Sequence, residues 1–175
     1  VIKVTFPAFS RMQSHPAELS RAVSKSIFVV SFLVFPSLVG LMLVAPVLVD
    51  VIPKYDKWQP ALLALVFYSI NAAWAAVTTP LTNLLNAIGK ITVTFRLMIM
   101  WTSLTWITVP ILAMLYGVNG AAAGAAIVGT SSVIAIFVVR KYISFDLMGS
   151  VGKPILASLL MGVVVLIVRN LGLPS

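Results

Sequence analysis

Five side chains that could bind a ligand recur along one apolar stretch of the sequence. At about 100° per residue of an α-helix, Asn71, Thr78 and Thr82 fall within a narrow arc of one face. Asn86 lies near that arc, and Trp74 flanks it. Uncharged amide and hydroxyl groups can hold the hydroxyl groups of a sugar, or they can bond to a neighbouring helix. The arc therefore predicts either a helix-to-helix contact or the wall of a polar cavity.

Arg96 is the one charged residue well inside an apolar stretch. Its long side chain could reach the membrane interface while the helix stays in lipid. Alternatively, the guanidinium could face a cavity and pair with an anionic group such as a lipid-linked pyrophosphate. Both interpretations remain open from the sequence.

Other groups that carry chemistry are scarce. The acids are Glu18, Asp50, Asp56 and Asp146, and each lies in a predicted loop or at the end of an apolar stretch. Cysteine is absent, and His15 is the only histidine. We therefore expect no metal site, no cofactor and no catalytic pair, so the chain should not be an enzyme. A carboxylate that binds a coupling ion at mid-membrane is also missing from these 175 residues.

The composition dictates the solvent that must surround these residues. Hydrophobic residues make up 61% of the chain and charged residues only 9%. A soluble domain carries roughly 25% charged residues, so most of this surface must face lipid. The net charge of +8 comes from short basic clusters beside apolar runs, which is typical of membrane topology signals and not of a nucleic-acid surface.

The positions of proline, glycine and charge divide the chain into helices. We predict an all-α, polytopic transmembrane helix bundle of about five spans, with residues 26–172 forming the bundle. Residues 1–25 are predicted to be the end of a preceding helix plus a cytoplasmic amphipathic linker, which implies a longer protein. The predicted spans are residues 26–52, 60–87, 91–116, 119–139 and 154–171.

Two spacings predict how these helices pack. Leu19, Val23 and Ile27 recur every fourth residue, which indicates an amphipathic stripe lying along the membrane surface before the first span. Gly120 and Gly124 have the small-residue spacing that lets two membrane helices approach closely.

The basic residues also predict an orientation. If five spans alternate in direction, nine lysines and arginines fall on one side and three on the other. The first set is Lys3, Arg11, Arg21, Lys25, Lys90, Arg96, Arg140, Lys141 and Lys153, and the second is Lys54, Lys57 and Arg169. Because lysine and arginine are enriched in cytoplasmic loops, we expect the first side to be cytoplasmic in a multi-pass protein of the cell membrane.

Several short segments occur in the order found in a known family. They are Val4–Gln13, Pro16–Leu19, Phe35-Pro36, Gly40-Leu41, Ala45-Pro46, Lys57-Trp58, Pro60–Leu62, Asn86–Lys90, Arg96-Leu97 and Tyr116–Ala122. In these segments the chain resembles the oligosaccharide-lipid flippases of polysaccharide biosynthesis, in the superfamily that includes the MATE exporters. It departs from them where they usually carry glycine, at Tyr55 or Asp56. The resemblance places the chain in the C-terminal lobe of a two-lobed, MATE-like transporter.

The resemblance implies transbilayer transport of a lipid-linked oligosaccharide by alternating access, without covalent chemistry. The partners would be the lipid bilayer, the lipid-linked substrate and an N-terminal lobe of the same chain, and no nucleic acid. Arg96 is the position that would match the family's cationic cavity residues. The alternatives are a cation-coupled drug exporter of the same superfamily and a polytopic membrane enzyme that transfers sugars.

Overall fold

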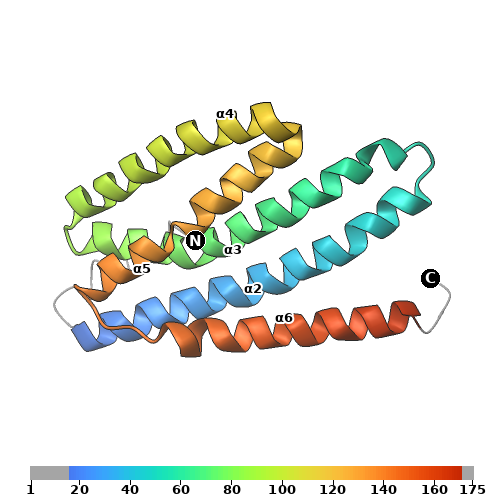
Figure 1. The fold of residues 1–175 in the computed structure, drawn as a ribbon. Coiled ribbons are helices and arrows are strands. Elements are labelled where there is room, and N and C mark those ends of the chain that lie inside the picture. The colour runs from blue at the N-terminus through green and yellow to red at the C-terminus, as the bar shows by residue number, and fades with distance from the viewer. Residues whose placement is uncertain (1–15, 171–175) are drawn as a thin grey trace.

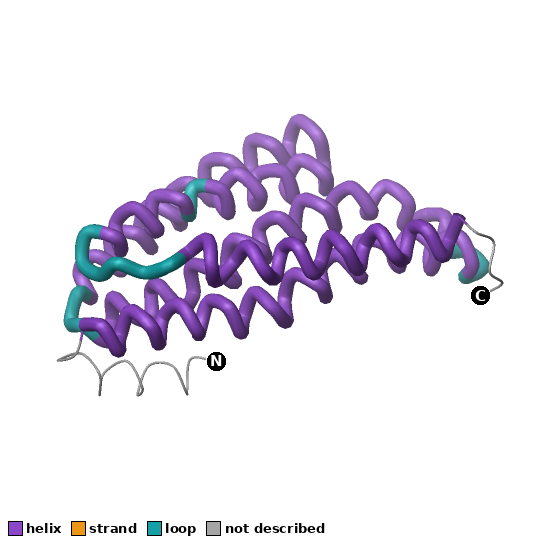
Figure 2. The backbone as a smooth tube through the Cα atoms, turned by 90° about the horizontal axis from the view of Figure 1, so that it is seen from below, coloured by secondary structure: helices purple, strands orange, loops and turns teal. Residues whose placement is uncertain are grey.

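The computed structural model describes the backbone of residues 16–170 and the side chains of residues 17–168. This part of the chain is helical, with no strand, and its long helices run roughly alongside one another (Figures 1 and 2). Four segments are long and apolar enough to cross a membrane: 17–51, 56–87, 91–140 and 147–168. The predicted all-α, polytopic bundle is therefore confirmed.

The first helix, α2 (Pro16–Val51), starts ten residues before the predicted first span. Proline suits the first turn because it lacks the amide donor that goes unused there. Leu19, Val23 and Ile27 are all 1% exposed or less, and they belong to the main apolar core. The amphipathic stripe was thus predicted in the right place, and it packs into the core of the bundle. The rest of the predicted linker, residues 1–15, lies outside the described residues.

The next long helix, α3 (Gln59–Ala87), follows a short 3-10 turn, η1 (Asp56–Trp58). It lies in the middle of the bundle, between α2 on one side and α4 on the other (Figure 1). Leu81, Leu84 and Leu85 are fully buried in it. The helix ends at Ala87, and two residues later Gly89, with a φ of +75°, allows the Lys90 amide to donate to the Leu85 carbonyl at 2.8 Å.

Helix α4 (Ile91–Thr130) doubles back on itself at Gly117 (Figure 1). At φ 62° and ψ −141° this residue occupies a region that is open essentially only to glycine. The two arms touch closely, because a Cβ added at Gly124 would lie 3.0 Å from the Cα of Val109. Segment 91–140 therefore contributes two passes, and the bundle has the five predicted from the sequence.

The fourth predicted span, 119–139, is interrupted. The second arm of α4 ends at Thr130, and α5 (Val133–Arg140) begins after Ser131 and Ser132. The Thr130 and Ser131 hydroxyls donate to carbonyls in the preceding turn, at 2.9 and 2.6 Å. Such bonds compete with the backbone ladder and bend helices, which accounts for a break within an apolar run.

The last helix, α6 (Leu147–Asn170), starts seven residues before the predicted fifth span. Asp146, predicted as part of a loop, caps this helix: its carboxylate accepts from the Gly149 amide at 2.8 Å. Lys153, also predicted in that loop, lies within the helix. Pro154, predicted to begin the span, is instead inside it and buried.

Most of the lysines and arginines lie at one end of the bundle, as the predicted alternation of five spans requires. The start of α2, the α3–α4 turn, the end of α5 and the start of α6 lie at one end of the bundle, and the 52–58 loop and Gly117 turn lie at the other (Figure 1). Among described side chains, the first end, called the cationic end below, carries Arg21, Lys25, Lys90, Arg96, Arg140, Lys141 and Lys153, and the opposite end carries Lys54 and Lys57. The chain is thus a multi-pass membrane protein with sharply unequal ends.

Candidate functional site

A polar pocket lies where α3 faces both arms of α4. It is lined by Asn71, Ala75 and Thr78 of α3, by Trp101, Val128 and Gly129 of α4, and by Ser132, and its volume is about 230 Å³. Two predicted site residues, Asn71 and Thr78, are therefore brought together. A cavity needs roughly 10–15 Å³ of such space to hold one water, so this pocket has room for several waters.

Asn71 is held against the backbone of α4. A Cβ added at Gly129 would lie 2.9 Å from the Asn71 Cα and 2.7 Å from its Oδ1. Only a residue without a side chain permits this approach of the two helices. Asn71 thus takes part in helix packing and also lines the pocket, so both interpretations of the polar arc apply at this position.

The threonine hydroxyls of the arc bond within their own helix. Thr78 Oγ1 donates to the Trp74 carbonyl at 3.0 Å, and Thr82 Oγ1 donates to the Thr79 carbonyl at 3.0 Å. A hydroxyl that donates its proton in this way still has lone pairs to accept a hydrogen bond. Thr78 is 6% exposed and lines the pocket, so it presents an acceptor there.

Trp101 and Ser132 are pocket residues that sequence reasoning missed. The Trp101 Nε1 is buried and has no hydrogen-bond partner in the described structure. An indole N–H without an acceptor is costly in a medium of low dielectric, so this donor favours water or a ligand oxygen in the pocket. A tryptophan ten residues into a span, away from the interface where tryptophan is enriched, was the available signal.

The remaining residues of the predicted arc lie outside this pocket. Trp74 packs against the apolar core, and Thr82 is half-buried one turn further along α3. Asn86 is near the end of α3, and its Oδ1 is buried with no partner among the described residues. The structure therefore divides the predicted site: Asn71 and Thr78 share a pocket, whereas the other residues of the arc do not line it.

Arg96 lines a separate pocket at the cationic end of the bundle. Its neighbours there are Val93, Leu97, Met100, Val138, Lys141 and Tyr142, and the volume is about 310 Å³. The Arg96 side chain is exposed, as expected for an arginine that reaches toward the interface. The structure does not bring Arg96 into the polar pocket of Asn71 and Thr78.

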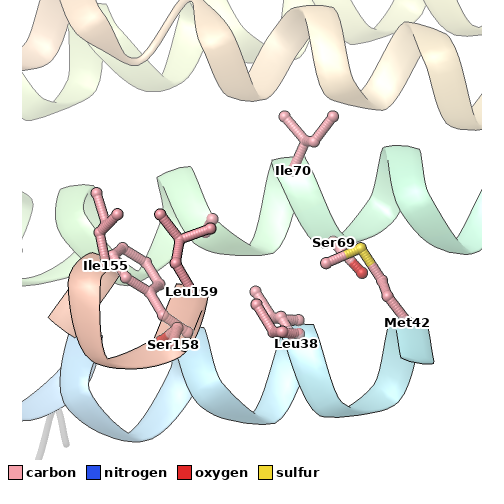
Figure 3. A pocket seen from close by; sticks show the side chains of 10 residues that line it. Leu38, Met42, Ser69, Ile70, Ile155, Ser158 and Leu159 are labelled. Carbon is pink, nitrogen blue, oxygen red and sulfur yellow. The ribbon is translucent and has the colours of Figure 1, made fainter. Parts of the chain in front are cut away.

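A third cavity, of about 230 Å³, lies between α2, α3 and α6 (Figure 3). Its labelled lining includes Leu38, Met42, Ile70 and Leu159. The two hydroxyls on its wall already donate to carbonyls of their own helices, Ser69 to Leu65 and Ser158 to Pro154. This cavity therefore presents only apolar surface and suits an alkyl chain.

Comparison with known proteins covers part of the chain. Residues 1–63 match a family described as "Polysaccharide biosynthesis protein". Neither the curated proteins nor the solved structures give a match. Within the part of the chain that the structure describes, no group of three His, Cys, Asp or Glu residues could hold a metal ion. The match covers less than half of the chain, so it shows that residues 1–63 are similar to that family.

Proposed function

We propose that the chain is part of a transporter that moves a lipid-linked oligosaccharide across the cell membrane by alternating access. The observation that carries this proposal is the match of residues 1–63 to polysaccharide biosynthesis proteins in a chain that folds as a multi-pass bundle. Polysaccharides built on a lipid carrier must have their hydrophilic part moved through a bilayer, which requires a protein with polar surface inside its spans.

The polar pocket supplies such surface. Asn71 provides an amide, Thr78 an acceptor, and Trp101 a donor that lacks a partner among the described residues. Uncharged groups of this kind suit sugar hydroxyls, which both donate and accept. The pocket is too small for an oligosaccharide, so its role would be to bind one part of the substrate while the rest lies outside it.

The positions of the described carboxylates favour transport that is not coupled to a cation bound within this bundle. Glu18, Asp50, Asp56 and Asp146 lie within a few residues of a helix end, so no described carboxylate sits at mid-membrane. Coupling to sodium or protons usually uses such a group. In this proposal the chain performs no covalent chemistry, and residues 1–25 together with the cationic end face the cytoplasm.

The proposal is tested by export in cells whose polysaccharide depends on the intact protein. We expect Trp101→Phe to lower surface polysaccharide several-fold, because phenylalanine keeps the ring but removes the N–H. The matched control is Trp106→Phe: Trp106 is 75% exposed, and its replacement should leave export unchanged at equal expression.

A second measurement separates transport from synthesis. Cells lacking the protein should accumulate the lipid-linked oligosaccharide on the inner leaflet, and the wild-type protein should restore its transfer to the outer leaflet. Cells that fail to make the lipid-linked oligosaccharide at all would contradict transport and favour a sugar-transferring enzyme.

A further inference from the structure

Two cations share the pocket at the cationic end. Arg96, about two turns into α4, and Lys141, directly after α5, both line it, together with Tyr142. Its volume of about 310 Å³ gives room for a headgroup-sized anion. The positive charges come from α4 and from the turn that follows α5, so the pocket depends on how the fold places these two segments.

These cations lack protein counterions. Among residues 17–168, no carboxylate oxygen lies within 4.0 Å of a lysine or arginine nitrogen. Asp146 is the acid closest in sequence to Lys141, and its carboxylate accepts from the Gly149 amide at the start of α6. Two like charges that line one pocket repel each other, so an anion bound between them would be stabilised.

Neighbouring aromatic rings hold two further cations at this end. The Lys90 Nζ lies 5.5 Å from the ring centroid of Tyr142, which is itself a wall of the pocket. The Arg140 guanidinium lies 5.9 Å from the Phe145 ring centroid, so it is held by a different ring. Lys90 thus adds a third positive charge beside the pocket.

Apolar side chains extend from the cations toward the middle of the bundle. Ile99 follows Arg96 by one turn of α4 and is 49% exposed. On α5, Phe137 and Ile134 precede Lys141 by one and two turns and are 61% and 47% exposed. These three side chains lie beside the pocket and not in its lining. Met100, one turn after Arg96, and Val138, one turn before Lys141, do line it, so the pocket is cationic at its outer end and apolar toward the membrane interior.

We propose that the Arg96–Lys141 pocket binds the phosphate headgroup of an anionic phospholipid from the adjacent leaflet, with its acyl chains along Ile99 and Phe137. A soluble anion would use only the cations, whereas a diacyl phosphate also covers the exposed apolar side chains. Basic pockets between membrane helices on the cytoplasmic side recognise anionic headgroups in this way. The site is distinct from the polar pocket of Asn71 and does not depend on the proposed transport.

The test is lipid binding by the purified intact protein in nanodiscs, titrated with phosphatidylglycerol or phosphatidylcholine and read by native mass spectrometry. We expect selective binding of phosphatidylglycerol, weakened roughly 30-fold by Arg96→Gln with Lys141→Gln, the effect of two basic residues near an anionic surface. Lys57→Gln is the matched control, because Lys57 also lies beside an aromatic ring, Trp58, but at the opposite end.

A charge-preserving variant keeps the test decisive if the double glutamine variant does not fold. Arg96→Lys with Lys141→Arg should retain selective binding within about threefold, because the headgroup contact is mainly electrostatic. Equal binding of both lipids by the wild-type protein would overturn the proposal. Binding of a polyprenyl pyrophosphate, with no phosphatidylglycerol bound in its absence, would also overturn it, since the pocket would then take the carrier lipid.

Discussion

The hairpin of α4 depends on Gly120, and replacing this glycine with alanine should destabilise the bundle. A Cβ at this position would lie 1.8 Å from the Leu112 carbonyl oxygen, 2.6 Å from its carbon and 2.9 Å from the Tyr116 Cβ. Ordinary contacts of a Cβ fall between 3.4 and 4 Å. The first arm must therefore move by more than 1 Å, and no side-chain rotation can relieve a clash with backbone atoms.

The size of this effect follows from known costs of overpacking. Inserting a methyl group into a packed core costs about 1–3 kcal/mol, and a clash with backbone atoms belongs at the upper end. We therefore expect Gly120→Ala to lower the free energy of unfolding by about 3 kcal/mol, or roughly 150-fold in the equilibrium constant. Alanine is the better helix former, so intrinsic propensity would act in the opposite direction.

The measurement is unfolding of the purified protein from mild detergent by added sodium dodecyl sulfate, followed by circular dichroism and tryptophan fluorescence. Gly152→Ala in α6 is the matched control, because an added Cβ there meets nothing within 4 Å. This control should be as stable as the wild type or up to about 1 kcal/mol more stable. Equal stability of Gly120→Ala and Gly152→Ala would refute the close approach of the two arms of α4.

Two further predictions concern the ends and the centre of the bundle. Asp146→Ala removes the carboxylate that accepts from the Gly149 amide, so it should lower the free energy of unfolding by about 1 kcal/mol, while Asp146→Asn should lower it by less. Leu84→Ala should lower the free energy of unfolding by about 2 kcal/mol, because its side chain is 0% exposed and its removal leaves a cavity. The loss is at the low end for such a substitution because the separated helices keep their lipid contacts. Leu159→Ala is its control, with a 59% exposed side chain that should make little difference in the same unfolding titration.

The sequence predicts most of the fold because apolar run length and turn residues act locally. Gly89 and Gly117 mark turns that need positive φ, and both turns appear where they were predicted. The start of α6 was placed too late because Asp146 was interpreted as a loop charge and not as a helix cap. The break after Thr130 was missed because Ser131 and Ser132 lie within an apolar run, where hydropathy gives no warning.

The candidate site was predictable only in part. Periodicity along one helix placed Asn71 and Thr78 on one face, and the structure does put them in one pocket. Trp101 and Ser132 come from other segments, and their register against α3 depends on helix packing that no single-helix pattern contains. Arg96 was identified by its charge, but Lys141 as its neighbour required the fold.

The claim on which the rest depends is that the cationic end of the five-pass bundle lies on one side of the membrane and the 52–58 loop on the other. Single cysteines at exposed positions test it directly: Lys54→Cys and Arg140→Cys, on a cysteine-free background and labelled in intact cells with a membrane-impermeant maleimide. We predict labelling at position 54 in intact cells, and at position 140 only after the membrane is permeabilised. Labelling of both positions from the same side would contradict the arrangement.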